Sequence, residues 1–422
     1  MIRLLTFLHF LVDGLCACAL FMLLPVVSDD MMWTVFVTYN ALAFLTQPFT
    51  GQWVDLNENH WSVLIVSAVL LLLGAVTAGC GVVYPADALH LGAAVLLGLG
   101  NSCFHVYGGK WVCCSSRNDM SSLGIFVSTG ALGLVLGQCF SSLWLLGVMT
   151  LVLLGGVWGL YAMVGLRRCR TSYFSQRVSH GSRFIIVFCI LVAVFARSFW
   201  GEIIPRAMHW EGTWIILLLG FLAMAGKAFG GYLATMVGTA PAFIGSMILA
   251  GVCFLLSDFH DVWICSAVFL VNVSMPITLY WVNRLYPHRE GYSFGLLAAM
   301  LIIGLAVAIG CEGSQQVFPV LRALVVTLIV ETLVLLFLRE QRWQVLAAMA
   351  LMNIATNVPL NLFGANLSLS VLLGLELVIV IVEAVLYCCV IHDIRRSIIY
   401  SLVCNVASLL IGTWILMMTM LG

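Results

Sequence analysis

The chain has 422 residues, of which 63% are hydrophobic and only 9% charged, and its mean hydropathy is +1.12. Soluble domains carry roughly 25% charged residues, so this composition indicates an all-α polytopic membrane protein with no soluble catalytic domain. The 18 Lys and Arg residues balance the 18 Asp and Glu residues, which excludes the basic surface that nucleic-acid binding requires.

Apolar segments separated by charged or turn-rich residues predict about fifteen membrane-spanning helices, because one span needs about 20 residues. The first segment begins like a secretory leader, but His9 and Asp13 interrupt it and further spans follow at once. We therefore expect an uncleaved first helix. The segments lie at 3–27, 31–53, 61–84, 88–110, 120–142, 145–166, 184–206, 212–236, 240–257, 262–284, 292–311, 316–339, 343–363, 368–391 and 397–421.

The orientation follows from the positive charges, since Lys and Arg of short loops remain on the cytoplasmic side. Placing the N-terminus in the cytoplasm puts most of the 18 basic residues there, including those of the polar connection 167–183. The opposite loops carry Asp29, Asp87 and Asp258 instead. An odd number of spans then places the C-terminus outside. We expect a multi-pass protein of the inner, cytoplasmic membrane.

An internal repeat divides the chain. Residues 47–55 (QPFTGQWVD) at the end of the second span align with 227–235 (KAFGGYLAT) at the end of the eighth, an offset of 180 residues. Gly124 and Gly133 align with Gly295 and Gly304 at an offset of 171 residues. Matching order and depth predict a duplication of six spans, as in many secondary transporters. The predicted domains are an N-terminal six-helix bundle (1–166), a cytoplasmic linker (167–183), a C-terminal six-helix bundle (184–340) and an additional three-helix segment (341–422).

Gly51, followed four residues later by Asp55, resembles the start of the signature that major facilitator superfamily transporters carry between helices 2 and 3. In that family basic residues follow the acid, whereas residues 56–60 contain none. Spans 1 and 4, the latter with GLGNSCFHVYGG at 98–109, are similar to a branch near the fosmidomycin-resistance exporters. The resemblance covers about 1–340 and implies a 6+6 transporter of a small solute, with export as one direction. It also implies a gating role for Asp55. For Lys227 the favoured interpretation is a side chain that reaches the cytoplasmic interface, and a gating role, suggested by the repeated GKAFGG pattern, is the alternative.

Ionisable residues in mid-membrane are costly and point to function. Asp13 lies ten residues past Arg3, about 15 Å along a helix, and His9 shares its face one turn earlier. Such a pair can exchange a proton near neutral pH. The alternative is a hydrogen-bonded structural pair. Proton coupling at Asp13 and His9 is therefore our hypothesis for this helix.

Arg197 lies deep in span 7, and Glu202 follows it after one and a half turns. Arginine suits two-pronged capture of a carboxylate or phosphate, so we expect a substrate-binding role. The alternative is an internal ion pair of Arg197 with Asp13, Glu202 or Glu331 that closes one conformation. All four are candidate substrate- or ion-binding residues.

Polar residues also interrupt spans 4 and 10. Asn101 and His105 lie one turn apart, and Asn272 lies near Pro276. In the resembled family helices 1, 4, 7 and 10 line the central cavity, which implies that these residues face it. A single membrane Asn often serves only a bond between helices, and this is the alternative for Asn272.

In the additional segment, Asn353, Asn357 and Asn361 share one helix face, and Glu376 and Glu383 repeat on the next helix. A polar seam that joins these helices is the favoured interpretation, and passage of protons or ions is the alternative.

The sequence thus favours a secondary transporter that works by alternating access, with protons and a small molecule as its partners and the lipid bilayer as its surroundings. A sensor or assembly subunit derived from a transporter is the alternative. We expect no enzyme, because no nucleophile and base share a suitable spacing, and no ATP-binding loop is present. Nearly all of the 15 Cys lie in apolar runs, so we expect no disulfide framework, no metal spacing and no cofactor.

Overall fold

The structure is a computed structural model that describes 2–56, 61–115, 120–164, 180–310, 317–340, 369–391 and 393–421, and, between 341 and 353, residues 342, 345, 346, 348–350, 352 and 353. All regular elements of these residues are helical. Ten helices of the described part are long and apolar enough to cross a membrane. The predicted all-α multi-pass membrane fold is therefore confirmed, while the predicted span 343–363 and the predicted linker 167–183 fall mainly outside the described residues.

The helices follow the predicted segments closely. Those before the linker are α1 (Ile2–Leu23), the short turn η1 (Leu24–Val26), α2 (Asp29–Asn40), η2 (Ala41–Leu45), α3 (Gln47–Leu56), α4 (Trp61–Val83), α5 (Asp87–Ser115), α6 (Met120–Cys139) and α7 (Leu143–Val164). Those after it are α8 (His180–Arg206), α9 (Thr213–Val237), α10 (Thr239–Leu255), α11 (Asp261–Leu285), α12 (Glu290–Gly310), α13 (Val317–Phe337), α15 (Leu369–Ile391) and α16 (Ile394–Leu421).

The second predicted span is not one regular helix. The π-helical turn η2 (Ala41–Leu45) separates α2 from α3, and Pro48 is the second residue of α3. Proline has no N–H, and its ring would clash with the carbonyl of residue 44 in a regular helix, so the turn before it widens. The span therefore contains a break that the apolar pattern does not show.

The chain forms two compact units. The first contains 1–250 and 260–309, and the second contains 251–259 and 310–422. Helix α13, which the sequence analysis assigns to the C-terminal bundle, belongs to the second unit, where it packs against α16 of the additional segment. The predicted domain boundaries at 166, 184 and 340 stay predictions.

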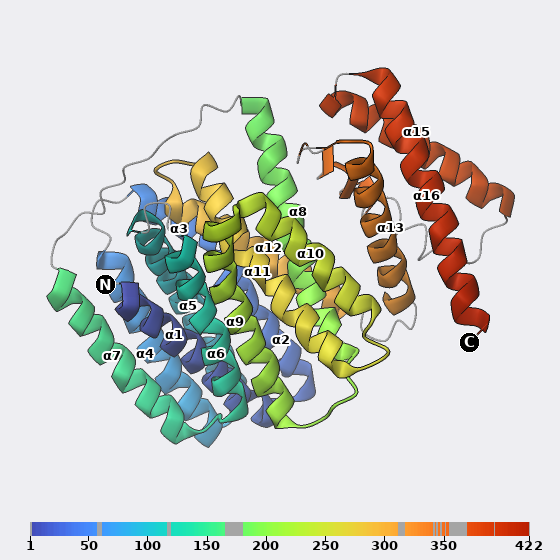
Figure 1. The fold of residues 1–422 in the computed structure, drawn as a ribbon. Helices are drawn as coiled ribbons and strands as arrows, with labels where there is room; N and C mark the ends of the chain where they lie inside the picture. The colour runs from blue at the N-terminus through green and yellow to red at the C-terminus, as the bar shows by residue number, and fades with distance from the viewer. Residues whose placement is uncertain are drawn as a thin grey trace. The chain divides into compact units, whose positions relative to one another are not determined.

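Within the first unit, the helices lie side by side along roughly one direction (Figure 1). Helix α1 packs closely on α6, where Gly133 faces the Phe10 carbonyl and Gly137 faces the Gly14 carbonyl. A side chain at either glycine would overlap this backbone. Close packing through small residues is how membrane helices associate without a hydrophobic driving force, and here it brings the middle of α1 against α6.

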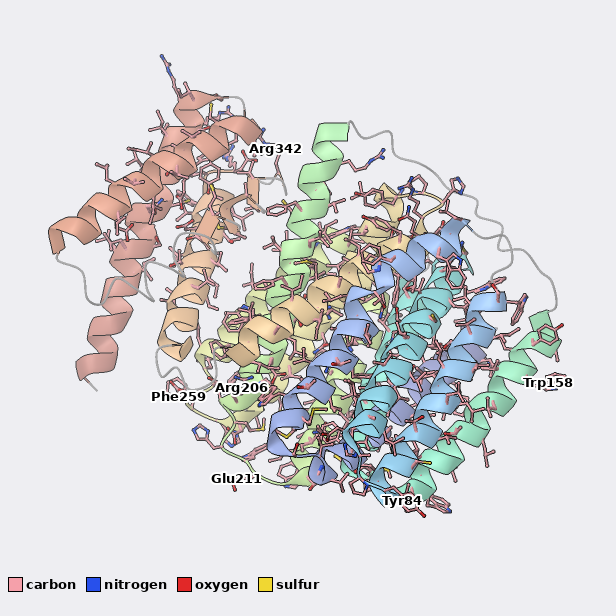
Figure 2. The ribbon with its side chains drawn as sticks, turned by 180° about the vertical axis from the view of Figure 1, so that it is seen from behind. Tyr84, Trp158, Arg206, Glu211, Phe259 and Arg342 are labelled. Atoms are coloured by element: carbon pink, nitrogen blue, oxygen red, sulfur yellow. The ribbon has the colours of Figure 1, made fainter. Side chains whose placement is uncertain are left out.

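The outer surface of the first unit is rich in exposed apolar and aromatic side chains. Tyr84, just after α4, and Trp158 on α7 are 73% and 72% exposed and project from the periphery (Figure 2). Aromatic residues concentrate at membrane interfaces. Such a surface suits contact with lipid.

Two helix crossings in this unit correspond through the sequence repeat. A Cβ on Gly51 of α3 would overlap Gly291 of α12, and one on Gly231 of α9 would overlap Met120 of α6. The offset of 180 residues relates Gly51 to Gly231, and the offset of 171 relates Met120 to Gly291. Applying the two sequence offsets to the crossing of α3 and α12 therefore gives the crossing of α9 and α6.

The adjacent contacts follow the same rule. A Cβ on Gly295 would overlap Gln47, and one on Gly124 would lie 2.8 Å from the Lys227 carbonyl oxygen. The same offsets relate Gln47 to Lys227 and Gly124 to Gly295. This pairwise exchange is the geometry expected of two duplicated bundles facing each other across a pseudo-twofold axis.

We expect Gly231→Ala to lower the thermal unfolding temperature in detergent. The new methyl group would overlap the Met120 backbone, and overpacking of this kind typically costs about 1–3 kcal/mol. Gly155→Ala on α7 is the matched control, because no atom lies within 4 Å of its added Cβ. Equal unfolding temperatures for the two variants would show that the α6 and α9 contact is loose.

Candidate functional site

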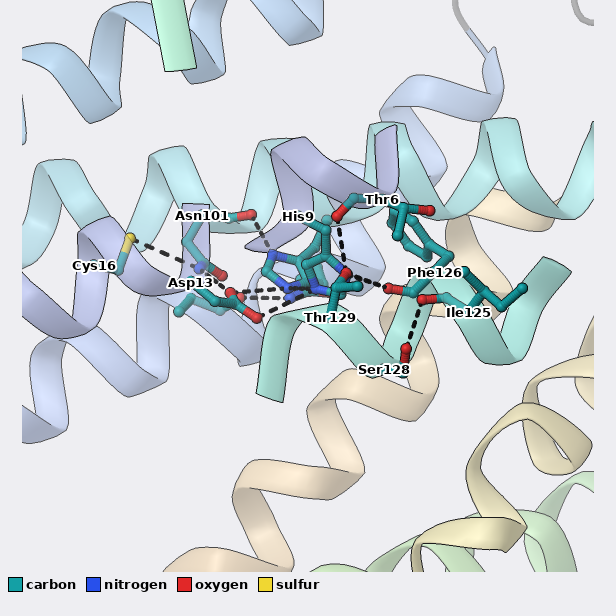
Figure 3. A network of polar contacts seen from close by, with 12 residues as sticks. Thr6, His9, Asp13, Cys16, Asn101, Ile125, Phe126, Ser128 and Thr129 are labelled. Carbon is teal, nitrogen blue, oxygen red and sulfur yellow. Dashed lines mark hydrogen bonds and ion pairs between the residues drawn. The ribbon is translucent and has the colours of Figure 1, made fainter. Parts of the chain in front are cut away.

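A buried cluster of ionisable side chains lies where α1, α5 and α6 meet (Figure 3). Helix α1 contributes His9 and Asp13, one turn apart, and α5 contributes Asn101 and His105, also one turn apart. His9, Asn101 and His105 are buried. The structure thus brings together four residues that the sequence analysis assigned to a central site.

The cluster is tightly connected. The Asp13 carboxylate lies 3.3 Å from His9 Nε2 through one oxygen and 3.3 Å from His105 Nε2 through the other. The two Nε2 atoms are 2.9 Å apart, and the Asn101 amide donates to the Asp13 carboxylate at 3.2 Å. Each polar head in the cluster therefore has at least two polar neighbours.

Hydrogen-bond partners fix the tautomers of both histidines. His9 Nδ1 lies 2.7 Å from the Phe126 carbonyl oxygen, and His105 Nδ1 lies 3.0 Å from the Asn101 carbonyl oxygen. A carbonyl oxygen can only accept, so each Nδ1 carries a proton and each neutral ring would present a lone pair at Nε2. Two lone pairs 2.9 Å apart beside a carboxylate repel one another, so the arrangement requires a positive charge between them.

Gly130 of α6 makes room for the cluster. A Cβ at this position would overlap the Asp13 carboxylate and lie 2.6 Å from His9 Nε2. Gly130 therefore provides the space that His9 and Asp13 occupy.

The donor atoms of His9, Asp13 and His105 lie within 4.8 Å of one another, a spacing that would also admit a metal ion. The sequence analysis expects no metal spacing, and these three residues come from two spans that no local motif connects. The 2.9 Å separation of the two nitrogens is that of a hydrogen bond, and we assign the positive charge of the cluster to a proton.

Arg197 lies in the middle of α8 and is 6% exposed. Within the described part of the chain it has no ion-pair partner, and its Nε has no hydrogen-bond partner. The predicted alternative, in which Arg197 pairs with Asp13 or Glu202, is not the arrangement of this structure. A buried guanidinium without an anion is costly, so this position suits an anion supplied from outside.

Lys227 of α9 adds a second positive charge to this region. Its ammonium group interacts electrostatically with Arg197 and Asp13 and also with His105. Asn272 of α11 packs beside it, against Gly226, while the Asn272 amide donates to the Val268 carbonyl of its own helix. The structure thus gives Lys227 neighbours among the central charges, and its predicted gating role stays a prediction.

Asp55 forms a second polar centre, at the end of α3. Its carboxylate pairs with Lys110 at 3.1 Å and accepts hydrogen bonds from the backbone N–H groups of Gly291 and Tyr292, at 3.1 and 2.8 Å. These are the first N–H groups of α12, where the helix dipole favours an anion. Asp55 therefore ties α3 and α5 to the start of α12.

The remaining predicted residues lie elsewhere. Glu202 forms an ion pair with Arg206 one turn later on α8, at 3.1 Å. Glu331 belongs to the second unit, where it accepts hydrogen bonds from Asn353 and Ser408. Glu202 has no described contact with the His9 and Asp13 cluster.

Sequence reasoning missed two contributors. Lys110, which the sequence analysis does not single out, supplies the basic partner for Asp55 that residues 56–60 lack. The Phe126 carbonyl, which orients His9, is a backbone group, so the residue type at this position does not indicate its role.

No protein-family model matches the chain, and no curated protein matches it. Solved structures do resemble it. The E. coli fucose:proton symporter matches with a TM-score of 0.55 and 12% identity over 74% of this chain and 90% of that chain. A bacterial homologue of the iron transporter ferroportin matches with 0.58 and 12% over 86% and 98%. The human organic anion transporter MFSD10 matches with 0.56 and 13% over 83% and 98%.

At these identities the likeness shows the fold. A further match is described as a major facilitator superfamily transporter in the outward conformation, with a TM-score of 0.57. The chain therefore has the major facilitator superfamily fold that the signature around Gly51 and Asp55 predicts.

Proposed function

We propose that this protein is a secondary active transporter that moves a small anionic solute by alternating access and couples this movement to protons at the cluster of His9, Asp13 and His105. It lies in the inner membrane with its N-terminus in the cytoplasm. The observation that carries the proposal is the pair of imidazole Nε2 atoms 2.9 Å apart beside a carboxylate.

That geometry supports one bound proton. Because both Nδ1 atoms already donate to carbonyl groups, a proton between the Nε2 atoms makes one ring an imidazolium, and Asp13 neutralises it. Removing the proton leaves two lone pairs and a carboxylate with one amide donor. The cluster therefore changes charge by one unit and changes its hydrogen bonds with each proton that it binds or releases.

The charges around the cluster favour an anionic solute. With its proton, the cluster is neutral, and Arg197 and Lys227 contribute two further positive charges to the same region. A deep site of this sign attracts anions, and arginine binds carboxylates and phosphates with two parallel hydrogen bonds. An organic anion transporter and a fucose:proton symporter are among the solved structures with this fold. The fold is therefore compatible with an anionic solute and with coupling to protons.

Alternating access requires contacts that can open. Asp55, Lys110 and the start of α12 form such a contact between segments that the repeat assigns to opposite bundles. Its strength depends on one carboxylate that serves a lysine and two backbone N–H groups. If this end of the protein opened, Asp55 would lose Lys110 and both backbone N–H groups at the same time.

We expect Asp55→Asn to increase hydrogen–deuterium exchange at the amides of Gly291 and Tyr292. The amide side chain cannot compensate the Lys110 charge, and breaking one side of a buried ion pair costs about 3–5 kcal/mol. Asp87→Asn is the matched control, because Asp87 lies exposed in the first turn of α5. Unchanged exchange at the two amides would exclude Asp55 as the latch.

A comparison of metabolites in cells with and without the gene tests the proposed function. We expect the solutes that change to be negatively charged at neutral pH. A change confined to neutral or cationic solutes would contradict the proposed substrate, and no change together with altered activity of a partner protein would favour the sensor.

A further inference from the structure

The second unit contains two buried carboxyl groups that the proposed transport site does not use. Glu331 lies on α13 and Glu383 on α15, and each is 1% exposed. Both are inside apolar helices that pack around Leu335, Tyr387 and Cys404. An ionised carboxylate in such a place needs a cation or several hydrogen-bond donors.

Amide side chains serve one oxygen of each carboxyl group. The Asn353 amide donates to Glu331 Oε2 at 2.7 Å, and the Asn405 amide donates to Glu383 Oε2 in a short hydrogen bond. Each amide uses its second proton on a carbonyl of its own helix, at Met349 and Ser401. The amides therefore have no donor left for the other carboxyl oxygen.

The neighbouring hydroxyl groups are shared with backbone carbonyls. Ser408 Oγ lies 3.3 Å from Glu331 Oε1, but it also lies 3.1 Å from the Asn405 carbonyl oxygen. Ser401 Oγ lies 3.4 Å from Glu383 Oε2 and 2.8 Å from the Val380 carbonyl oxygen. A hydroxyl has one proton, so each serine can donate to the carboxyl group or to the carbonyl, but not fully to both.

The titratable groups that face these carboxyls do not balance their charge. Glu331 and Glu383 interact electrostatically with each other, with Glu376 of α15, with Tyr387 of α15 and with Cys404 of α16. All of these are acids. No Lys, Arg or His of the described residues is paired with either carboxyl group.

Unused polar atoms complete the arrangement. Glu383 Oε1 and the hydroxyl of Tyr387 are buried and have no hydrogen-bond partner among the described residues. Tyr387 is fully buried. The cluster thus has few donors for its carboxyl groups and unused hydrogen-bonding atoms beside them.

We propose that Glu331 and Glu383 form a second proton-binding site, separate from the cluster on α1 and α5, in which each carboxyl group binds and releases one proton. With its proton, Glu331 can accept from Asn353 through Oε2 and donate to Ser408 through Oε1, which leaves the Ser408 proton for the Asn405 carbonyl. Without their protons, the two buried carboxylates have no described cation beside them, and each depends on one amide and one shared hydroxyl.

Infrared difference spectroscopy of the full chain in lipid, titrated from acid to alkaline pH in H₂O and in D₂O, tests this site. We expect the wild-type protein to show the C=O band of protonated carboxylic acids, shifted by deuterium and lost at alkaline pH. Glu331→Gln and Glu383→Gln should each remove part of this band, because glutamine reproduces the hydrogen bonds of a protonated glutamate without an exchangeable acid proton. Glu211→Gln, at an exposed position, is the matched control.

Absence of a band that responds to pH in the wild-type protein would overturn the proposal, and this measurement does not depend on the folding of any variant. A band that neither variant reduces would also overturn it. Loss of the band on addition of Na⁺ at constant pH would identify a monovalent cation as the ligand instead. None of these outcomes involves solute transport, so they leave the proposed function untouched.

Discussion

Asp13→Asn is expected to abolish solute transport driven by a pH gradient while solute exchange at equal pH on both sides continues. The amide keeps the size of the side chain but cannot bind the proton. It also removes the negative charge that neutralises the imidazolium of His9 or His105. The measurement is transport by reconstituted vesicles with and without an imposed pH gradient.

Asp87→Asn provides the same chemical change at an exposed site and should retain the response to the gradient. If Asp13→Asn responds to the gradient as the wild-type protein does, Asp13 has no part in coupling. Loss of both driven transport and exchange would instead make Asp13 part of the solute contacts.

Arg197→Gln is expected to weaken binding of the anionic solute by about 10- to 100-fold, since hydrogen bonds to charged groups contribute about 1.5–3 kcal/mol. The same variant should unfold at a higher temperature. Arg197 is buried without an ion-pair partner in the described structure, so its removal relieves a desolvation cost. Solute binding and thermal unfolding are measured on the same preparation.

Arg197→Lys keeps the charge but loses the two-pronged geometry, and it should fall between the wild-type protein and Arg197→Gln in affinity. Arg395→Gln, at an exposed position of α16, should change neither quantity. A lower unfolding temperature for Arg197→Gln together with unchanged affinity would assign Arg197 to a structural ion pair.

The sequence predicts the fold because its signals are local. Long apolar segments define the helices, and the offsets of the repeat identify the glycines at which α3 meets α12 and α6 meets α9. The break before Pro48 and the association of α13 with the additional segment depend on packing. No apolar pattern carries that information.

The candidate site is predictable in part for the same reason. Helical spacing places His9 next to Asp13 and Asn101 next to His105. A polar residue in mid-membrane costs free energy, so each such residue is a candidate functional residue from the sequence alone. The contact between the two pairs depends on how α1 and α5 pack. For that reason the facing Nε2 atoms and the pairing of Asp55 with Lys110 could be found only in the structure.

The most direct test of proton-coupled anion transport is the proton movement that accompanies solute entry into vesicles containing a pH-sensitive dye. The probes are small carboxylates and organic phosphates, with an uncharged sugar for comparison. We expect at least one anion to drive proton movement across the membrane of wild-type vesicles and none to do so in Asp13→Asn vesicles. Proton movement of equal size in both, or movement driven only by the uncharged sugar, would contradict the account.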